Sequence, residues 1–294
     1  MRSEKEMFQL ILDVAKADSR VRAVYMNGSR ANPKARKDIF QDYDIVYVVT
    51  DTIGFIEDEG WVSVFGELII SQEPDKVDKM LGKEVDFNRG YTYLMQFTDG
   101  NRIDLHLQPL ERVEKEYGLD KLTVPLLDKD DCLKKLPEPS DKDYWVKKPT
   151  YEQYYSRCNE FWWVAPYCAK GLWREEILYT IEQMNYCVRE ELLTMLSWYV
   201  GTKTQFTLSI GKANKYLKSY IKEDWWNRLM QTFNLSNDEL VWKALIIACE
   251  LFMEVAPKVG EALGYKYNIE ETGRSLAFIK HIKDLPKDAK HIYE

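Results

Sequence analysis

Short apolar segments alternate with polar residues over the first half of the chain, which is the pattern of β-strands. An amphipathic helix is expected first, over 4–17, because its apolar residues recur at three- and four-residue spacing. A short helix is expected over 112–117. Strands are predicted at 23–26, 44–49, 65–71, 92–97, 102–108 and 122–127. The first half therefore predicts a mixed α/β domain.

The spacing of apolar residues becomes helical after Pro149. The segment Thr150–Gln153 reads Thr-Tyr-Glu-Gln, a capping box that predicts the start of a helix reaching about 169, with Gly171 as its end. A second capping box, Ser236–Glu239, precedes another helical pattern. Helices are expected at 173–199, 208–220, 223–233, 237–263 and 272–282. The second half therefore predicts an all-α bundle.

Two prolines, Pro137 and Pro139, interrupt any regular element between the two halves. We therefore expect an α+β domain over 1–136, a linker over 137–149 and a helical domain over 150–294. A chain of 294 residues, 45% of them hydrophobic, is long enough to bury two modest cores.

Composition limits where the protein works and what it binds. The sequence contains no apolar run of membrane-spanning length, and its charged N-terminus lacks the apolar region of a signal peptide. The five cysteines are odd in number and never spaced Cys-x-x-Cys, which favours buried thiols in a reducing, cytoplasmic environment. A formal net charge of −7 argues against nucleic acid as a partner and favours a cationic one.

Three acidic residues are the candidate chemistry of the first half. Asp42 and Asp44 stand two residues apart at the mouth of an apolar strand, so they project to the same side. Asp104 lies within a later strand and joins them if the two strands pair. Carboxylates about 4 Å apart repel by roughly 4 kcal/mol at an effective dielectric near 20. Such a cluster favours a bound cation, and an oxygen-only ligand set suits Mg²⁺.

A turn ahead of these acids has the features of a phosphate-binding loop. Gly28 allows the backbone to approach a phosphate closely, and Ser29 offers a hydroxyl and a backbone N–H. Arg30 adds a guanidinium, whose planar donors match phosphate oxygens. The turn is not a Walker P-loop, because no Gly-Lys-Ser/Thr follows.

Together these residues resemble the nucleotidyltransferase superfamily typified by DNA polymerase beta. More narrowly, the chain resembles the aminoglycoside 6-adenylyltransferases over most of its length. The segments that carry this resemblance are 40–45, 65–68, 99–105, 127–130, 144–150, 158–162 and 169–172. The resemblance implies a nucleotidyltransferase-like mixed sheet with flanking helices and a C-terminal all-α bundle. It also implies Mg²⁺, ATP as co-substrate, and a streptomycin-type aminoglycoside as acceptor in antibiotic resistance.

The mechanism is a hypothesis built on that resemblance. Asp42 and Asp44 hold Mg²⁺ on the triphosphate, while Gly28, Ser29 and Arg30 steady its β and γ oxygens. Asp104 completes the metal site and is the first candidate for the general base. Glu67 is the second candidate, because family members differ in the carboxylate that acts as base.

The acceptor is expected in a cleft between the domains, against an aromatic and acidic part of the helical half. The predicted substrate residues are Glu160, Trp163, Trp173 and Glu176. Lys170 is predicted to reach the triphosphate. Each residue also has a structural interpretation, since tryptophans at helical spacing often form core and a lysine is often a surface cation.

Two other functions remain open from the sequence. One is a nucleotidyltransferase acting on protein or RNA, as antitoxin-type enzymes do, although those are commonly shorter single domains. The other is a catalytically silent nucleotide-binding module, which the presence of all three acids disfavours. A monomer or weak homodimer is expected.

Overall fold

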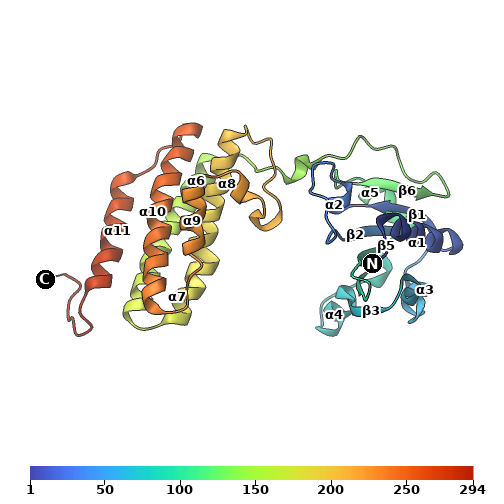
Figure 1. Cartoon of the computed structure of the whole chain (residues 1–294), viewed down its shortest axis with the longest axis horizontal. Coiled ribbons are helices and arrows are strands. Elements are labelled where there is room, and N and C mark those ends of the chain that lie inside the picture. Colours follow the sequence, from blue (N-terminus) through green and yellow to red (C-terminus); the bar gives the residue numbers. More distant parts are fainter. Residues whose placement is uncertain (294) are drawn as a thin grey trace. The chain divides into compact units, whose positions relative to one another are not determined.

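The computed structural model describes residues 1–293, which form two compact units, one over 1–143 and the other from residue 144 to the end of the described chain (Figure 1). The first unit is built on a six-stranded mixed sheet and the second is helical. The α+β fold class predicted from the sequence is therefore confirmed. Within the described residues, no helix combines the length and the apolar character needed to cross a membrane.

The sheet of the first unit has the strand order β3-β4-β5-β2-β1-β6. Its strands are β1 (Val21–Met26), β2 (Tyr43–Val49), β3 (Leu68–Gln72), β4 (Tyr91–Phe97), β5 (Arg102–Pro109) and β6 (Val124–Asp128). The central strands β2 and β5 are parallel, and every other neighbouring pair is antiparallel. Because β2 and β5 are parallel, their N-terminal ends meet at one end of the sheet.

Helices flank this sheet on both faces, with α1 packed on one face and α5 on the other. They are α1 (Glu4–Ala17), α2 (Gly28–Ala31), α3 (Ile53–Ile56), α4 (Pro74–Met80) and α5 (Val113–Glu116). α1 begins at a capping box in which Ser3 and Glu6 satisfy each other's backbone N–H groups. Met7 and Ile11 of α1 are fully buried, and the Tyr47 hydroxyl of β2 donates to the Ile11 carbonyl. These contacts fix β2 at the centre of the unit.

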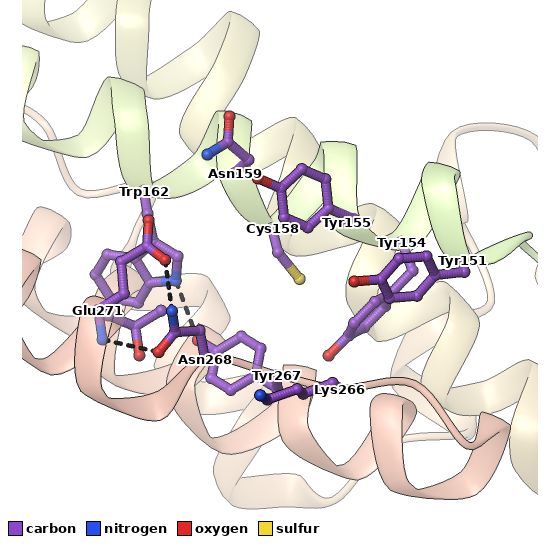
Figure 2. A pocket seen from close by; sticks show the side chains of 11 residues that line it. Tyr151, Tyr154, Tyr155, Cys158, Asn159, Trp162, Lys266, Tyr267, Asn268 and Glu271 are labelled. Carbon is purple, nitrogen blue, oxygen red and sulfur yellow. Dashed lines mark hydrogen bonds between the residues drawn. The ribbon is translucent and has the colours of Figure 1, made fainter.

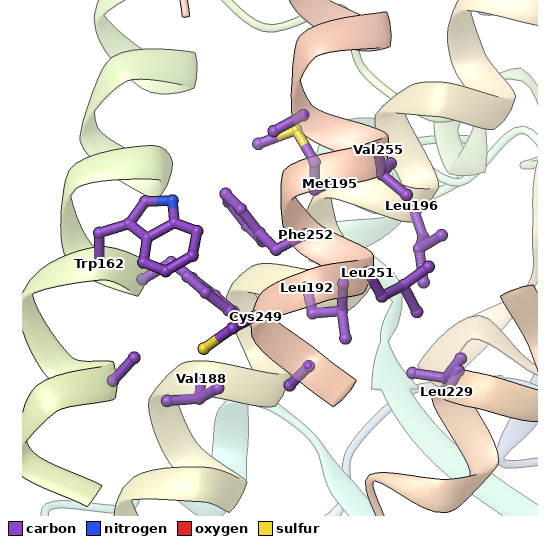
Figure 3. Close-up of a cluster of buried hydrophobic side chains, with 14 of the residues drawn as sticks. Trp162, Val188, Leu192, Met195, Leu196, Leu229, Cys249, Leu251, Phe252 and Val255 are labelled. Carbon is purple, nitrogen blue, oxygen red and sulfur yellow. The ribbon is translucent and has the colours of Figure 1, made fainter. Parts of the chain in front are cut away.

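The second unit is a helical bundle. Its helices are α6 (Tyr151–Trp173), α7 (Ile177–Gln183), α8 (Arg189–Lys203), α9 (Glu223–Gln231), α10 (Asp238–Leu263) and α11 (Ile269–Asp284). Figure 3 shows the core between them, where buried side chains of α6, α8 and α10 interdigitate. Phe161 and Phe252 stack there with ring centroids 3.9 Å apart. The predicted capping box at Thr150 is confirmed as the start of α6.

Several predicted boundaries are wrong, each for a local reason. The segment 208–220 is not a helix but a loop with two 3-10 turns, because Gly211, Ala213 and Asn214 all adopt positive φ angles. The helix predicted over 173–199 is broken instead into α7, a π-helical turn at Met184–Val188, and α8. α6 does not end at Gly171 but continues to Trp173.

The strand predicted over 65–71 also begins later than expected. Phe65 ends a 3-10 helix and is buried, and Gly66 follows at φ 129°, a conformation that breaks the extended chain. β3 therefore starts at Leu68, which leaves Glu67 in the turn ahead of the strand. The second predicted capping box does not form, because Asn237 rather than Ser236 caps α10, its side chain accepting from the Leu240 N–H.

Candidate functional site

Two acidic residues face each other where the parallel strands begin. In the register of β2 and β5, Asp44 lies directly opposite Asp104. Asp42 precedes β2 by one residue and, two positions from Asp44, projects to the same side. The structure therefore brings the three predicted carboxylates to one face of the sheet. Two strands supply them, so the site depends on the pairing at the centre of the sheet.

Arg102 is the cation of this cluster. Its Nε donates to Oδ1 of Asp104 at 2.7 Å and its Nη2 to Oδ2 at 2.8 Å. The same Nε lies 3.7 Å from Oδ2 of Asp42. No role was predicted for Arg102 from the sequence, although its position two residues before Asp104 places both side chains on one face of β5.

The electrostatics of the cluster show a deficit of positive charge. Burial, together with the neighbouring charges of Asp104 and Asp42, raises the pKa of Asp44 to about 6. Burial also raises the pKa of Asp42, while the charge of Arg102 opposes that shift. Arg102 and, more weakly, Arg30 lower these pKa values without cancelling the increase, so the site is suited to an additional cation.

The donor set fits Mg²⁺ in chemistry, because it consists of carboxylate oxygens that repel one another. In the part of the chain that the structure describes, however, no three His, Cys, Asp or Glu side chains stand together as metal ligands. The Asp104 carboxylate is instead held by Arg102. A metal bound by all three acids therefore requires Arg102 to release Asp104.

The Gly-Ser turn lies against the same acids. Gly28 has a φ of 75°, and a Cβ built on it would lie 2.0 Å from Oδ2 of Asp44. Only glycine fits this position, because both the backbone conformation and the space exclude a side chain. The Asn27 N–H donates to the Asp44 carbonyl at 2.9 Å, which fixes the turn to the start of β2. Ser29 follows in α2, near the Gln41 amide.

Arg30 makes contacts of a different kind from those predicted. Its Nε donates to the Asp42 carbonyl at 2.9 Å and its Nη2 to the Gln41 carbonyl at 2.7 Å. The guanidinium also lies over the Tyr43 ring and pairs with Glu4, with 8% of the side chain exposed. In this structure Arg30 therefore holds the backbone that carries Asp42.

A groove adjoins the acids on the same face of the sheet. The register pairs Leu94 with Asp104, Gln96 with Arg102, and Ile70 with Gln96, so these side chains share one face. The groove has a volume of about 480 Å³ and is lined by Ile70, Ser71, Gln72, Leu94, Met95, Gln96 and Arg102. Arg102 thus connects the acidic cluster to a surface large enough for part of a small ligand.

Glu67 lies apart from this groove. It lines a separate hollow near the N-terminus, together with Arg2, Phe97 and Asp99. Its backbone carbonyl accepts from the Thr98 N–H at 2.9 Å, and its carboxylate lies 3.4 Å from the Thr98 hydroxyl. The structure therefore does not bring Glu67 to the three aspartates.

The predicted acceptor residues of the helical unit differ in how available they are. Trp163 is 64% exposed, and Glu160 and Glu176 are also exposed. Trp173 is partly buried, and its indole N–H donates to the Leu285 carbonyl at 3.0 Å. Lys170 lies over the rings of Tyr167 and Phe278.

A pocket that the sequence did not predict lies between α6 and the start of α11. Figure 2 shows its aromatic walls, with Tyr151, Tyr154, Tyr155 and Trp162 from α6 and Tyr267 from the opposite side. Its volume is about 270 Å³. Several polar groups are already paired. The Trp162 indole donates to the Tyr267 hydroxyl at 3.0 Å, and the Asn268 amide donates to Glu271 at 2.7 Å.

Comparison with known proteins gives consistent matches over most of the chain. The family described as Streptomycin adenylyltransferase matches residues 1–282. The chain is 43% identical over 267 residues to an aminoglycoside 6-adenylyltransferase of Campylobacter jejuni, with 91% of each protein covered. A protein of the same name from Bacillus subtilis (strain 168) is 38% identical over 268 residues, covering 91% of this chain and 93% of the relative.

A third protein of that name, from Staphylococcus aureus, is 37% identical over 268 residues, with 91% and 94% coverage. Among solved structures, an aminoglycoside 6-adenyltransferase from Bacillus subtilis is 34% identical, covers 96% of this chain and 99% of its own, and has a TM-score of 0.47. The sequence matches span both structural units.

Proposed function

The chain belongs to the streptomycin adenylyltransferase family, and we propose that it transfers AMP from Mg²⁺–ATP to a hydroxyl of a streptomycin-type aminoglycoside, releasing pyrophosphate. The family match confirms the resemblance seen in the sequence motifs and identifies a nucleotidyltransferase family. The observation that carries the proposal is the opposition of Asp44 and Asp104 across the parallel strands, within the matched residues.

Asp42, Asp44 and Asp104 are the residues that would hold Mg²⁺. The metal would supply positive charge against the triphosphate and the departing pyrophosphate. Gly28 lets its turn lie directly against the Asp44 carboxylate, and Ser29 offers a hydroxyl and an N–H to a phosphate group. Arg30 keeps the Asp42 backbone in place, so we assign it a positioning role in addition to the predicted contact with phosphate.

The reaction is an in-line displacement at the α-phosphorus. The acceptor oxygen forms the new P–O bond, and the bond between the α-phosphorus and the bridging oxygen of pyrophosphate breaks. Asp104 takes the proton of the acceptor hydroxyl after its release from Arg102. Glu67 remains the second candidate for the general base. Because it lines a separate hollow, its position supports this role less well than that of Asp104 does.

The acceptor side is proposed to involve the helical unit. Glu160 and Trp163 are exposed and so able to offer a carboxylate and a flat apolar ring to an aminocyclitol, although Oε1 of Glu160 also accepts from the Cys187 thiol at 3.7 Å. Glu176 is also exposed, ahead of α7. Of the four predicted residues, Trp173 is the least available to contact the acceptor, because its indole N–H already donates to a backbone carbonyl.

The test is pyrophosphate release from Mg²⁺–ATP with and without streptomycin. Release that requires the drug, together with a drug product heavier by one AMP, is the expected result. Release with neither drug nor another acceptor would favour a silent nucleotide-binding module. Labelling of a protein or RNA by ATP, with streptomycin left unmodified, would replace the aminoglycoside as acceptor.

A further inference from the structure

The helical unit contains a carboxylate that is buried and only half paired. Glu191 of α8 exposes 5% of its side chain. Its Oε1 accepts from Nη1 of Arg157 at 2.7 Å, whereas its Oε2 has no hydrogen-bond partner among residues 1–293. An unpartnered buried carboxylate oxygen is costly, because the water it has lost is not replaced.

This carboxylate lines a hollow between α6 and α8. The hollow has a volume of about 460 Å³ and is lined by Glu152, Gln153, Ser156, Arg157, Glu160 and Glu191. Its charged groups are three carboxylates and one guanidinium, so it carries an excess of negative charge. Burial and the charge of Glu160 both raise the pKa of Glu191, although Arg157 opposes them. The hollow therefore lacks a second cation.

The aromatic pocket of Figure 2 does not have this deficit. Its acid, Glu271, already accepts from Asn268, and Lys266 stands nearby as a cation. The hollow beside Glu191 is thus better suited to a positively charged group than the aromatic pocket is. It also contains Glu160, which the sequence pattern assigned independently to acceptor binding.

We propose that Glu160 and Glu191 form the subsite that binds a guanidinium or ammonium group of the acceptor. The inference rests on the proposed function, because that function supplies a polycationic acceptor. Arg157 shows that the site accommodates a guanidinium, since it already places one against Glu191. Its side chain is 43% exposed, so it is able to swing towards solvent and yield Glu191 to the ligand.

Three variants of the full-length protein separate this role from a structural one. Glu160→Gln and Glu191→Gln should raise the KM for streptomycin about tenfold or more while leaving the KM for ATP unchanged. Arg157→Gln should lower the KM for streptomycin, because it removes the resident competitor. Glu182→Gln, an exposed acid of α7 with the same charge change, is the matched control and should leave both values unchanged.

A purely structural ion pair predicts a different result. Glu191→Gln and Arg157→Gln would then lower the Tm together and leave the KM for streptomycin unaltered, which would overturn the inference. If Glu191→Gln fails to fold, the other two variants still test the inference, because Glu160→Gln should raise the KM for streptomycin and Arg157→Gln should lower it. An ammonium-only aminoglycoside run in parallel shows whether the subsite prefers guanidinium.

Direct calorimetric binding of streptomycin separates this inference from the proposed function. If the wild type releases no pyrophosphate with streptomycin, the proposed function fails. Binding that is lost in Glu160→Gln would still support the cation subsite. Equal binding by the wild type and Glu160→Gln, or no binding by either, would overturn it.

Discussion

Arg102 holds both carboxylate oxygens of Asp104, with Nε at 2.7 Å from Oδ1 and Nη2 at 2.8 Å from Oδ2. Its Nε also lies 3.7 Å from Oδ2 of Asp42. The pair keeps the charge of Asp104 compensated in the absence of ligands. It also means that the guanidinium competes with a metal ion or an incoming proton for Asp104.

Replacing this arginine should shift the pH dependence of the reaction. The charge of Arg102 lowers the pKa of both Asp42 and Asp44, so Arg102→Gln should move the acid limb of the activity profile to higher pH. Initial rates of pyrophosphate release between about pH 5 and pH 8 measure this shift. Arg89→Gln, an exposed arginine of the same unit, is the control. An acid limb that stays in place would contradict the coupling.

The two acids at the mouth of β2 are predicted to be essential. Asp42→Asn or Asp44→Asn should reduce AMP transfer by a factor on the order of 1,000 or more, because each removes a negatively charged oxygen ligand. Circular dichroism should show an intact fold, since both changes relieve repulsion between carboxylates. Glu84→Gln, an exposed acid of the same unit, should keep normal turnover. Near-normal turnover in either aspartate variant would refute the assigned role.

The raised pKa of Asp44 predicts how stability depends on pH. The folded pKa, about 6, lies above the unfolded value of 3.8, so folding favours the protonated carboxyl. This contribution to the free energy of unfolding is fully present below about pH 4 and is lost as the pH rises through about 6. Asp44→Asn should remove that part of the pH dependence, as measured by Tm in EDTA.

Magnesium should reverse this trend. Its binding requires the ionised carboxylates, so the Tm increase on adding Mg²⁺ should grow between about pH 5 and pH 7. Thermal denaturation with Mg²⁺ and with EDTA, at matched ionic strength, measures the difference. A Tm increase that is independent of pH, or that persists in Asp44→Asn, would argue against a metal at this carboxylate.

The Gly28 turn offers a steric test of the site. A Cβ at Gly28 would lie 2.0 Å from Oδ2 of Asp44, so Gly28→Ala should displace that carboxylate and reduce turnover by about 100-fold or more. Gly82→Ala is the matched control. Its φ is also positive, at 81°, but a Cβ there meets no other atom of the described chain within 4 Å. It should cost about 1–2 kcal/mol of stability, because alanine disfavours a positive φ, and leave turnover intact. Equal turnover in the two variants would contradict the role of the close approach.

The acidic face could be predicted from the sequence because it follows from strand geometry. Alternation places Asp42 and Asp44 on one side, and the parallel register sets Asp104 opposite Asp44. The same strand alternation could have predicted that Arg102 lies beside Asp104, since the two share a strand face. The sequence pattern alone did not reveal that Arg102 pairs with Asp104. With this pair in place, no three acids stand together as metal ligands within residues 1–293.

Other features depend on contacts between distant residues or on backbone conformation. The burial of Glu191 depends on Arg157, 34 residues earlier in the chain, so no local pattern marks it. The helix predicted over 208–220 failed because apolar spacing does not report the positive φ angles at Gly211 and Asn214. Glu67 was misplaced because the turn at Gly66 interrupts an otherwise strand-like pattern.

The parallel neighbours β2 and β5 are separated by the whole segment from Thr50 to Asn101, which builds β3, α4 and β4 at one side of the sheet. The geometry of the proposed catalytic acids is thus set by two adjacent strands, while the intervening segment forms an edge of the sheet. Insertions or deletions around α4 should change the width of the neighbouring groove without moving the acids. Relatives of this chain could therefore diversify what they accommodate there while keeping the same reaction centre.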